Sequence, residues 1–355
     1  MIRTTPPLKI QSIKQTILNR EKPSETELSR KIQLIGSGST LFNLACSDCL
    51  EGAFGVGKIV NIIGDPSSGK TLMALSIFAE ACISPHLSSY KLIYDDAECA
   101  NEFDMGRLFG RETVKRIETI SSDTIQTFYV NVKKYLDKKK PFIYILDSLD
   151  ALTSEEELDH LESLRKARSA GKTSKGTYDL SKQKFISKIL RDIVHAIKDT
   201  QSLLIVISQT RDNISPISFE PKTRAGGRAL RFYCSHEVWL AVKRKIKKSD
   251  LPIGVQVRAK ITKNKLTGKL REVEFPILYD YGIDDLRSCI EYLIETETWK
   301  ENKGIITDGA FTGSIPKVIK TIEADNKEEY IRNLVKKIWD RIEDSIKSNR
   351  KPKYQ

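Results

Sequence analysis

The sequence predicts an α/β fold with a mainly parallel sheet, an N-terminal helical arm and a small C-terminal domain. Short apolar runs rich in β-branched residues recur from residue 58 onward, and helical stretches separate them. These runs are continuous rather than alternating, which is typical of strands buried on both faces of a parallel sheet. Residues before 34 and after 285 do not follow this pattern.

The length of 355 residues fits one large domain with smaller attachments, or two domains. Hydrophobic residues make up 39% and charged residues 30% of the chain, which is typical of a globular protein. No apolar run approaches the roughly 20 residues of a membrane helix, and the N-terminus lacks the apolar segment of a secretory signal. We therefore expect a cytoplasmic protein with no membrane partner.

Residues 1–33 are expected to form an oligomerisation arm and linker. The stretch from Leu8 to Leu18 is amphipathic, and the polar linker "REKPSETELSRK" follows it. Since an amphipathic helix on a polar tether needs an apolar groove elsewhere, we expect it to dock on the adjacent protomer. Packing on its own domain is the alternative.

Residues 34–285 are expected to form the core, with strands at 58–64, 91–96, 142–147 and 202–208. The segment 154–184 breaks the pattern, because an acidic helix runs into a basic tract rich in Gly and Ser. We interpret this segment as a mobile loop. The helical pattern that follows predicts a C-terminal domain over 286–349 and a basic tail over 350–355.

The cysteines are scattered through the predicted strands and helices, which favours reduced thiols over a disulfide framework. Only "CSDC" has metal-like spacing, and no second pair accompanies it, so we expect small buried side chains there and not a zinc site. The six cysteines are Cys46, Cys49, Cys82, Cys99, Cys234 and Cys289.

The stretch "GDPSSGKT" predicts a phosphate-binding loop between a strand and a helix. Its first glycine allows a sharp turn, and successive backbone N–H groups at the helix start can surround phosphate oxygens. The lysine can reach the β- and γ-phosphates, and the threonine hydroxyl can ligate Mg²⁺. The predicted nucleotide-binding residues are Gly64, Asp65, Pro66, Ser67, Ser68, Gly69, Lys70 and Thr71.

Polar side chains follow three of the predicted strands. Asp147 ends "FIYILD", where a carboxylate can hold the hydration shell of Mg²⁺ opposite Thr71. Glu98, just after "KLIYDD", can deprotonate the water that attacks a γ-phosphate, with Asp95 and Asp96 as competing candidates. Gln209 ends "LLIVISQ", where its amide can contact the γ-phosphate.

The net charge of +12 and the pI near 9.2 favour a polyanionic partner, although excess lysine can also be a solvated surface. Two basic runs each lie just beyond a predicted strand, which favours DNA over a solvated charge run. The first run contains Arg165, Lys166, Arg168, Lys172 and Lys175, and the second contains Arg211, Lys222, Arg224, Arg228 and Arg231.

The order of these motifs resembles the bacterial RecA recombinases and their phage relatives of the UvsX type, from about residue 34 to about residue 310. "LIGSGSTLFNLAC", "DAE", "LDSLDALT" and "LLIVISQTRDNI" match successive motifs of that family. "TRAGGRALRFYCS" and "AKITKNKLTG" resemble the end of its second DNA-binding loop and its paired-lysine motif.

The resemblance implies roles for individual residues. Glu98 would be the general base, Asp147 the magnesium carboxylate, and Gln209 the switch between γ-phosphate and the second DNA-binding loop. Gly226 and Gly227 would form the flexible end of that loop, and the first basic run would lie in the other DNA-binding loop.

The paired lysines of "KNK" are Lys263 and Lys265. They occupy alternate positions of an apparent strand, so both side chains should project to the same side. The resemblance implies that they reach the γ-phosphate bound by the next subunit, and an interdomain salt bridge is the alternative.

The sequence also departs from the family. RecA proteins usually present an aromatic ring to adenine shortly after "DAE", and here Met105 is the nearest match, with Phe103 close by. The first basic run is longer than usual and the tail is basic, which favours a phage or mobile element as the source.

We therefore expect a protein that uses ATP and Mg²⁺ to form a helical homo-oligomeric filament on single-stranded DNA and to exchange strands with double-stranded DNA. Loader or single-strand-binding proteins would be further partners, at the nucleoid of a bacterial or phage-infected cell. The alternatives are a mediator ATPase of the same fold and a ring-forming helicase motor.

Overall fold

The structure is a computed structural model that describes residues 32–100, 104–169, 181–212, 222–224, 227–308, 310–348, 350–351 and 353. The described part forms two compact units, which divide between Ser288 and Cys289. The predicted N-terminal arm lies outside the described residues.

The larger unit contains a central sheet whose strands pair mainly in parallel. Six neighbouring strands, in the order β9-β3-β7-β6-β4-β5, are mutually parallel, and β10, β11 and β12 extend the sheet antiparallel beyond β9. The strands are β3 (Lys58–Gly64), β4 (Lys91–Asp96), β5 (Ile117–Ile120), β6 (Phe142–Asp147), β7 (Leu203–Asp212), β8 (Lys222–Arg224), β9 (His236–Lys248), β10 (Leu251–Asn264), β11 (Glu272–Leu278) and β12 (Gly282–Ile283). The predicted α/β class with a mainly parallel sheet is confirmed.

Continuous burial explains why the central strands read as apolar runs. Every residue of β6 is buried, and in β3 only the first residue is partly exposed. Strands that are covered on both faces need apolar side chains on both. Polar side chains therefore collect where these strands end.

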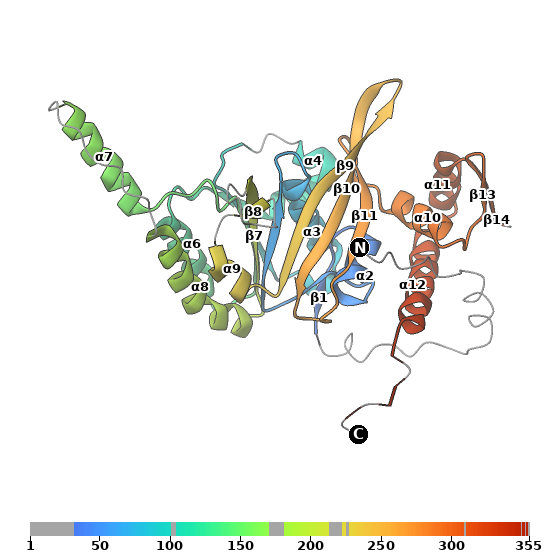
Figure 1. Ribbon diagram of the computed structural model, residues 1–355, viewed down its shortest axis with the longest axis horizontal. Coiled ribbons are helices and arrows are strands. Elements are labelled where there is room, and N and C mark those ends of the chain that lie inside the picture. The colour runs from blue at the N-terminus through green and yellow to red at the C-terminus, as the bar shows by residue number, and fades with distance from the viewer. Residues whose placement is uncertain are drawn as a thin grey trace, which may run out of the picture. The chain divides into compact units, whose positions relative to one another are not determined.

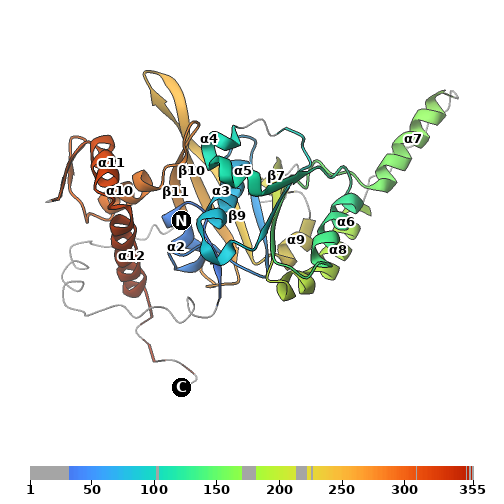
Figure 2. The same ribbon diagram turned by 180° about the vertical axis from the view of Figure 1, so that it is seen from behind.

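Helices cover the sheet. Side chains of α6 (Ile125–Leu136), α8 (Ser181–Asp199) and α9 (Gly227–Tyr233) pack into one apolar cluster with β4, β6 and β7, and the three helices lie together in Figure 1. The helices α3 (Lys70–Ile83), α4 (Met105–Phe109) and α5 (Arg111–Arg116) are grouped together in Figure 2.

The smaller elements of this unit are α2 (Thr40–Ser47), the strand pair β1 (Leu34–Ile35) and β2 (Phe54–Gly55), and the turn η1 (Pro85–Leu87). Helix α2 is buried along its length, and Phe42 packs edge-on against Phe54 and Phe275. This packing fixes α2 against β2 and β11.

The expectation of a mobile loop over 154–184 is wrong for much of its length. Helix α7 runs over Glu155–Ser169 and α8 begins at Ser181. A capping box starts α7, because Glu157 N–H donates to Ser154 Oγ at 3.2 Å and Ser154 N–H donates to Glu157 Oε2 at 3.0 Å. The helix projects from its neighbours in both views (Figure 1).

The smaller unit contains a three-stranded antiparallel sheet and helices. Its elements are β13 (Glu301–Asn302), β14 (Ile305–Asp308), β15 (Phe311–Gly313), α11 (Ile315–Ala324) and α12 (Glu328–Ser345), and α10 (Asp285–Glu295) spans the division between the units. Trp299 stacks on Phe311 with ring centroids 5.5 Å apart, and Trp339 lies 6.1 Å from Tyr292. These aromatic pairs give the unit a core of its own.

Candidate nucleotide-binding site

The "GDPSSGKT" loop connects β3 to α3 and requires its glycines. A Cβ on Gly64 would lie 2.4 Å from Ser68 Oγ and 2.6 Å from the carbonyl oxygen of Leu240. Gly69 has a φ of +85°, in the left-handed region that costs a non-glycine residue about 1 kcal/mol or more. The glycines therefore allow the loop to close tightly over the start of α3.

Donors in this loop suit an anion. The N-cap of α3, Gly69, has no side chain to bond the first N–H groups of the helix. Within the described residues the buried hydroxyl of Ser68 makes no hydrogen bond. Lys70 Nζ donates to the main-chain oxygen of Asp65 at 2.7 Å, and burial lowers the pKa of Lys70 although nearby carboxylates, Asp147 foremost, oppose the shift. The loop therefore fits a phosphate group.

Thr71 and Asp147 lie together beside the loop. Thr71 Oγ1 donates to Asp147 Oδ2 at 2.6 Å, and Tyr94 OH donates to the same oxygen at 3.2 Å. Burial raises the pKa of Asp147, and the hydrogen bond from Thr71 opposes that shift. A hydroxyl and a carboxylate are hard oxygen ligands of the type that Mg²⁺ takes together with substrate phosphates.

Glu98 and Gln209 are in direct contact. Gln209 Nε2 donates to Glu98 Oε1 at 2.8 Å, and Ser148 Oγ donates to the same oxygen at 2.5 Å. The main-chain N–H of Gln209 donates to Asp150 Oδ2 at 2.7 Å. Polar groups from the ends of three adjacent strands, β4, β6 and β7, therefore form one network.

Asp95, one of the two competing candidates for the base, lies in a different environment. Its side chain is fully buried and accepts hydrogen bonds from Ser122 N–H and Ser122 Oγ, both at 2.7 Å, and from Tyr144 OH at 2.5 Å. Burial raises its pKa, and these bonds oppose the shift. This arrangement is typical of a structural carboxylate, whereas Glu98 is exposed beside the phosphate loop.

Three residues near the site were not predicted from the sequence: Ser148 and Asp150 of this network, and Tyr94, which bonds Asp147. Ser148 and Asp150 stand in "LDSLDALT", directly after a predicted strand end. Polar residues at the ends of parallel strands meet at one edge of the sheet, so this position was an available signal. The hydroxyl of Tyr94 gave no such signal, because the residue lies inside an apolar strand.

Lys263 lies in β10 and Lys265 directly follows the strand, and both amino groups lie at the C-terminal end of α9. Lys263 Nζ donates to the carbonyl oxygens of Arg231 and Phe232, the latter at 3.0 Å, and Lys265 Nζ lies 3.4 Å from the Phe232 oxygen. Cations at a helix C-terminus are favoured by the helix dipole. Both partners here are neutral main-chain carbonyls, and an anion such as a phosphate would attract the lysines more strongly.

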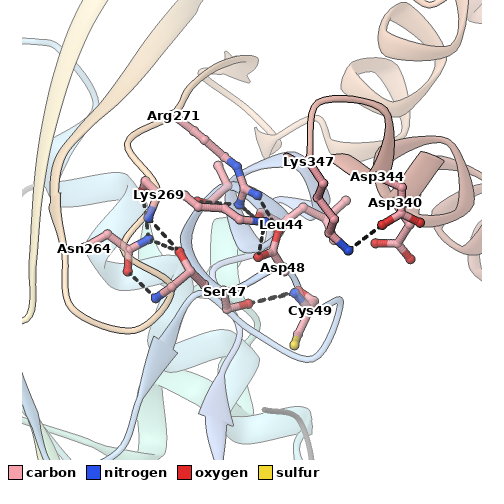
Figure 3. A network of polar contacts seen from close by, with 12 residues as sticks. Leu44, Ser47, Asp48, Cys49, Asn264, Lys269, Arg271, Asp340, Asp344 and Lys347 are labelled. Atoms are coloured by element: carbon pink, nitrogen blue, oxygen red, sulfur yellow. Dashed lines mark hydrogen bonds and ion pairs between the residues drawn. The ribbon is translucent and has the colours of Figure 1, made fainter. Parts of the chain in front are cut away.

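Asn264, between the two lysines, anchors their turn (Figure 3). Its amide nitrogen donates to the carbonyl of Cys46 at 2.8 Å, and its Oδ1 accepts from the N–H groups of Leu266 and Thr267. Asp48, at the end of α2, pairs with Arg271 at 2.6 Å and with Lys269 at 3.0 Å. Hydrogen bonds and ion pairs therefore attach the turn to the C-terminal end of α2.

The basic runs are only partly described. Arg165 and Lys166 are exposed near the end of α7, where Lys166 pairs with Glu162 at 3.0 Å, and Arg168 is on the same helix. Strand β8 pairs antiparallel with the end of β7, so Arg211, Lys222 and Arg224 flank the undescribed residues 213–221. Arg228 follows Gly227 at the start of α9. Lys172, Lys175 and Gly226 lie outside the described residues.

Met105 is the first residue of α4, and Phe103 lies outside the described residues. Two exposed tyrosines, Tyr279 and Tyr281, follow β11, and the side chain between them, Asp280, lies 3.8 Å from Arg107 of α4. The strand approaches the phosphate loop, since Ile277 Cδ1 would lie 2.6 Å from a Cβ on Gly69. The sequence "LYDYG" therefore carries aromatic rings near Met105, which occupies the position where RecA proteins usually have an aromatic residue.

Cys46 and Cys49 of "CSDC" are buried. In the described ranges, no group of three or more His, Cys, Asp and Glu side chains is arranged to hold a metal ion. None of the helices in the described part of the chain has the length and apolar character needed to cross a membrane.

Comparisons with known proteins show the family to which the chain belongs. The RecA N-terminal domain family matches residues 20–284. The chain is 29% identical to protein RecA of Corynebacterium efficiens over 271 residues, which are 76% of this chain and 65% of that protein, just under two thirds. It is 30% identical to protein RecA of Bartonella bacilliformis over 263 residues, or 74% of this chain and 70% of that protein. With protein RecA of Corynebacterium jeikeium the identity is 29% over 317 residues, or 89% and 78%.

Proposed function

Because the chain belongs to the RecA N-terminal domain family, we propose that it is a DNA-dependent ATPase that forms a helical filament on single-stranded DNA and catalyses strand exchange with homologous duplex DNA. The observation that carries the proposal is the contact between Glu98 and Gln209. It links the side chain best placed to activate water with the strand that leads into the second basic run.

The donor set of the loop supports ATP as the nucleotide. The backbone from Ser67 to Thr71 and the ammonium of Lys70 would hold the phosphates. Thr71 and Asp147 would hold Mg²⁺, which when bound supplies neutralisation of phosphate charge. Glu98 would take the proton of the attacking water, and Gln209 would respond to the γ-phosphate.

Exposed aromatic rings near Met105 support a position for the base of the nucleotide. Met105 at the start of α4 and the exposed rings of Tyr279 and Tyr281 lie on elements joined by the pair of Arg107 and Asp280. We propose that one of these tyrosines contributes the flat apolar surface that Met105 does not provide.

Lys263 and Lys265 would act on the nucleotide of the neighbouring subunit. Their shared position at the C-terminal end of α9 and their replaceable carbonyl partners support this role. Two cations delivered across a subunit interface would stabilise charge that develops during phosphoryl transfer. ATP would then join the protomers before it is hydrolysed.

The basic runs would bind the phosphate backbone of DNA. Arg165, Lys166, Arg168, Lys172 and Lys175 would form the first DNA-binding segment, and Arg211, Lys222, Arg224, Gly226, Gly227 and Arg228 the second. We further propose the domain boundaries 1–33, 34–285, 286–349 and 350–355, and action in the cytoplasm of a bacterial or phage-infected cell.

A joint-molecule assay tests the proposal. Purified protein, ATP and Mg²⁺ are incubated with circular single-stranded DNA and either homologous or heterologous linear duplex. We expect joint molecules with the homologous duplex alone. A mediator ATPase would hydrolyse ATP without forming them, and electron microscopy with a nonhydrolysable ATP analogue would show closed rings for a helicase motor.

A further inference from the structure

The phosphate loop carries an acidic side chain, Asp65, whose carboxylate is held by Thr210. Thr210 Oγ1 donates a short hydrogen bond to Asp65 Oδ1. The two residues are neighbours because β3 and β7 pair in parallel with Gly64 opposite Gln209. Asp65 directly follows β3 and Thr210 lies within β7, so the bond joins the start of the phosphate loop to β7.

A carboxylate in an anion-binding loop opposes the function of the loop. Like charges repel, and the repulsion is strong where the surroundings exclude water. The main-chain oxygen of Asp65 accepts from Lys70 at 2.7 Å, whereas its side chain is directed to Thr210. The residue therefore offers its carbonyl to the lysine while the hydroxyl of Thr210 satisfies the carboxylate.

Thr210 also begins the segment that carries the second basic run. It directly follows Gln209 and pairs with Arg224 of β8. A displacement of this strand pair would break the hydrogen bond from Thr210 to the Asp65 carboxylate. Conversely, a phosphate in the loop would favour the strand position in which the carboxylate remains bonded.

We propose that Thr210 is a positioning residue that holds the Asp65 carboxylate away from the phosphates of a nucleoside di- or triphosphate, and that this bond links nucleotide affinity to the β7–β8 segment. The inference rests on the proposed nucleotide site. It is separate from the contact of Gln209 with Glu98, because it acts on the loop that would hold the phosphates of ADP as well as ATP. Linkage requires that the effect be reciprocal.

A double-mutant cycle measured with Mg-ADP by isothermal titration calorimetry tests the first part. We expect Thr210→Val to weaken ADP binding about tenfold, in the range of ordinary coupling between sites. Thr210→Ser keeps the hydroxyl and should bind ADP like the wild type. In the Asp65→Asn background, where no negative charge remains to be held, Thr210→Val should change affinity by less than about twofold.

The same titrations with an oligo-dT strand present test the second part. In the wild type, bound oligo-dT should change the ADP affinity by about fivefold or more. In Thr210→Val the ratio of the ADP affinities with and without oligo-dT should fall towards one. An effect of oligo-dT that is absent from the wild type, or that persists in Thr210→Val, would overturn the linkage.

Thermal unfolding of each variant without nucleotide identifies a simple folding defect. If Thr210→Val and Thr210→Ser weaken ADP equally, or if Thr210→Val is as harmful in the Asp65→Asn background as in the wild type, Thr210 does not act through the carboxylate. A wild type that fails to bind ADP would contradict the proposed function, whereas binding that is indifferent to Thr210 would contradict this inference alone.

Discussion

Gln209 Nε2 donates a hydrogen bond of 2.8 Å to Glu98 Oε1. Gln209 lies in β7 and Glu98 follows β4, and β6 lies between those strands. The contact therefore bridges the strand that carries Asp147. A group that displaces Gln209 from Glu98 would change both the environment of the carboxylate and the position of the strand that follows Gln209.

Glu98→Gln should retain ATP and DNA binding and lose ATP turnover by about 100-fold or more, the scale of general-base catalysis. The change removes the proton acceptor and nearly preserves the side-chain volume. Phosphate release on single-stranded DNA measures the loss. Asp96→Asn is the matched control, and near-normal turnover by Glu98→Gln would move the base to another carboxylate.

Much of the fold could be predicted because the central strands are buried on both faces. The expected runs at 58–64, 91–96 and 142–147 coincide with β3, β4 and β6. The fourth was placed correctly but ended too early, because β7 continues to Asp212 where β8 pairs with it. Apolar runs mark burial, whereas polar strand extensions depend on a partner strand that the sequence does not identify.

The candidate site could be predicted only in part. Residues of the loop and of the strand ends stand in local patterns, so their types alone suggested them. The bonds from Ser148 to Glu98 and from Thr210 to Asp65 join segments far apart in sequence. Such pairings depend on strand order. The acidic start of α7 was expected, whereas its continuation through the basic residues to Ser169 was not.

Replacing the exposed tyrosine that supports adenine should weaken ATP binding by roughly 1–3 kcal/mol, the usual contribution of a base stacked on an aromatic ring. Tyr279→Ala and Tyr281→Ala are measured separately by competition titration. Inorganic tripolyphosphate, which has no base, is the control ligand and should bind both variants like the wild type. If neither change affects ATP, the adenine is held elsewhere.

DNA affinity should fall steeply with salt, because bound lysines and arginines displace counterions from phosphates. The double variants Arg165→Ala with Lys166→Ala, and Lys172→Ala with Lys175→Ala, should each flatten the log–log slope by about one unit for each phosphate-binding side chain removed. Fluorescence anisotropy of a labelled oligonucleotide measures the slope. Lys115→Ala, an exposed lysine paired with Glu112 at 2.6 Å, is the control. If both double variants have the same salt slope as Lys115→Ala, the first basic run is solvated surface and does not bind phosphates.

Acid should destabilise the larger unit through His236. Burial lowers the pKa of His236 to about 4 from 6.5, and its ring nitrogen Nδ1 shares a hydrogen bond with Ser235 Oγ at 3.2 Å. The unfolded state therefore binds the proton first, and the free energy of unfolding falls as the pH drops from about 6.5 towards 4. The loss amounts to about 3 kcal/mol for this residue.

Urea unfolding of wild type and His236→Gln at several pH values isolates this contribution from the carboxylates. The difference between the two proteins should change between pH 6.5 and 4 and be constant above pH 7. If the difference in unfolding free energy between the two proteins is constant throughout, the pKa of His236 is the same in the folded and unfolded states.

Lys263→Ala and Lys265→Ala should leave the protomer folded and able to bind nucleotide, and should abolish ATP-induced filament tightening and DNA-stimulated turnover. Their amino groups donate to main-chain oxygens of α9, and Lys265 Nζ also lies 5.9 Å from the centre of the Phe232 ring, so their removal leaves no buried charge without a partner. Electron microscopy and phosphate release measure the two losses. Asn264→Ala should produce a weaker form of the same defect, because the lysines remain but their turn loses its bond to Cys46.

Action across the subunit interface further predicts that two inactive variants can complement each other, which a defect within one protomer would not allow. Lys70→Ala protein has a defective phosphate loop and intact lysines, whereas Lys263→Ala protein has the reverse. In a mixed filament, some junctions bring the intact loop of one variant against the intact lysines of the other, so the mixture should hydrolyse ATP although each variant alone does not. Mixing Lys70→Ala with the double variant Glu98→Gln and Lys263→Ala is the control, since no junction is then complete. Equal inactivity of both mixtures, or normal turnover by Lys263→Ala alone, would show that the lysines do not act on a neighbour's nucleotide.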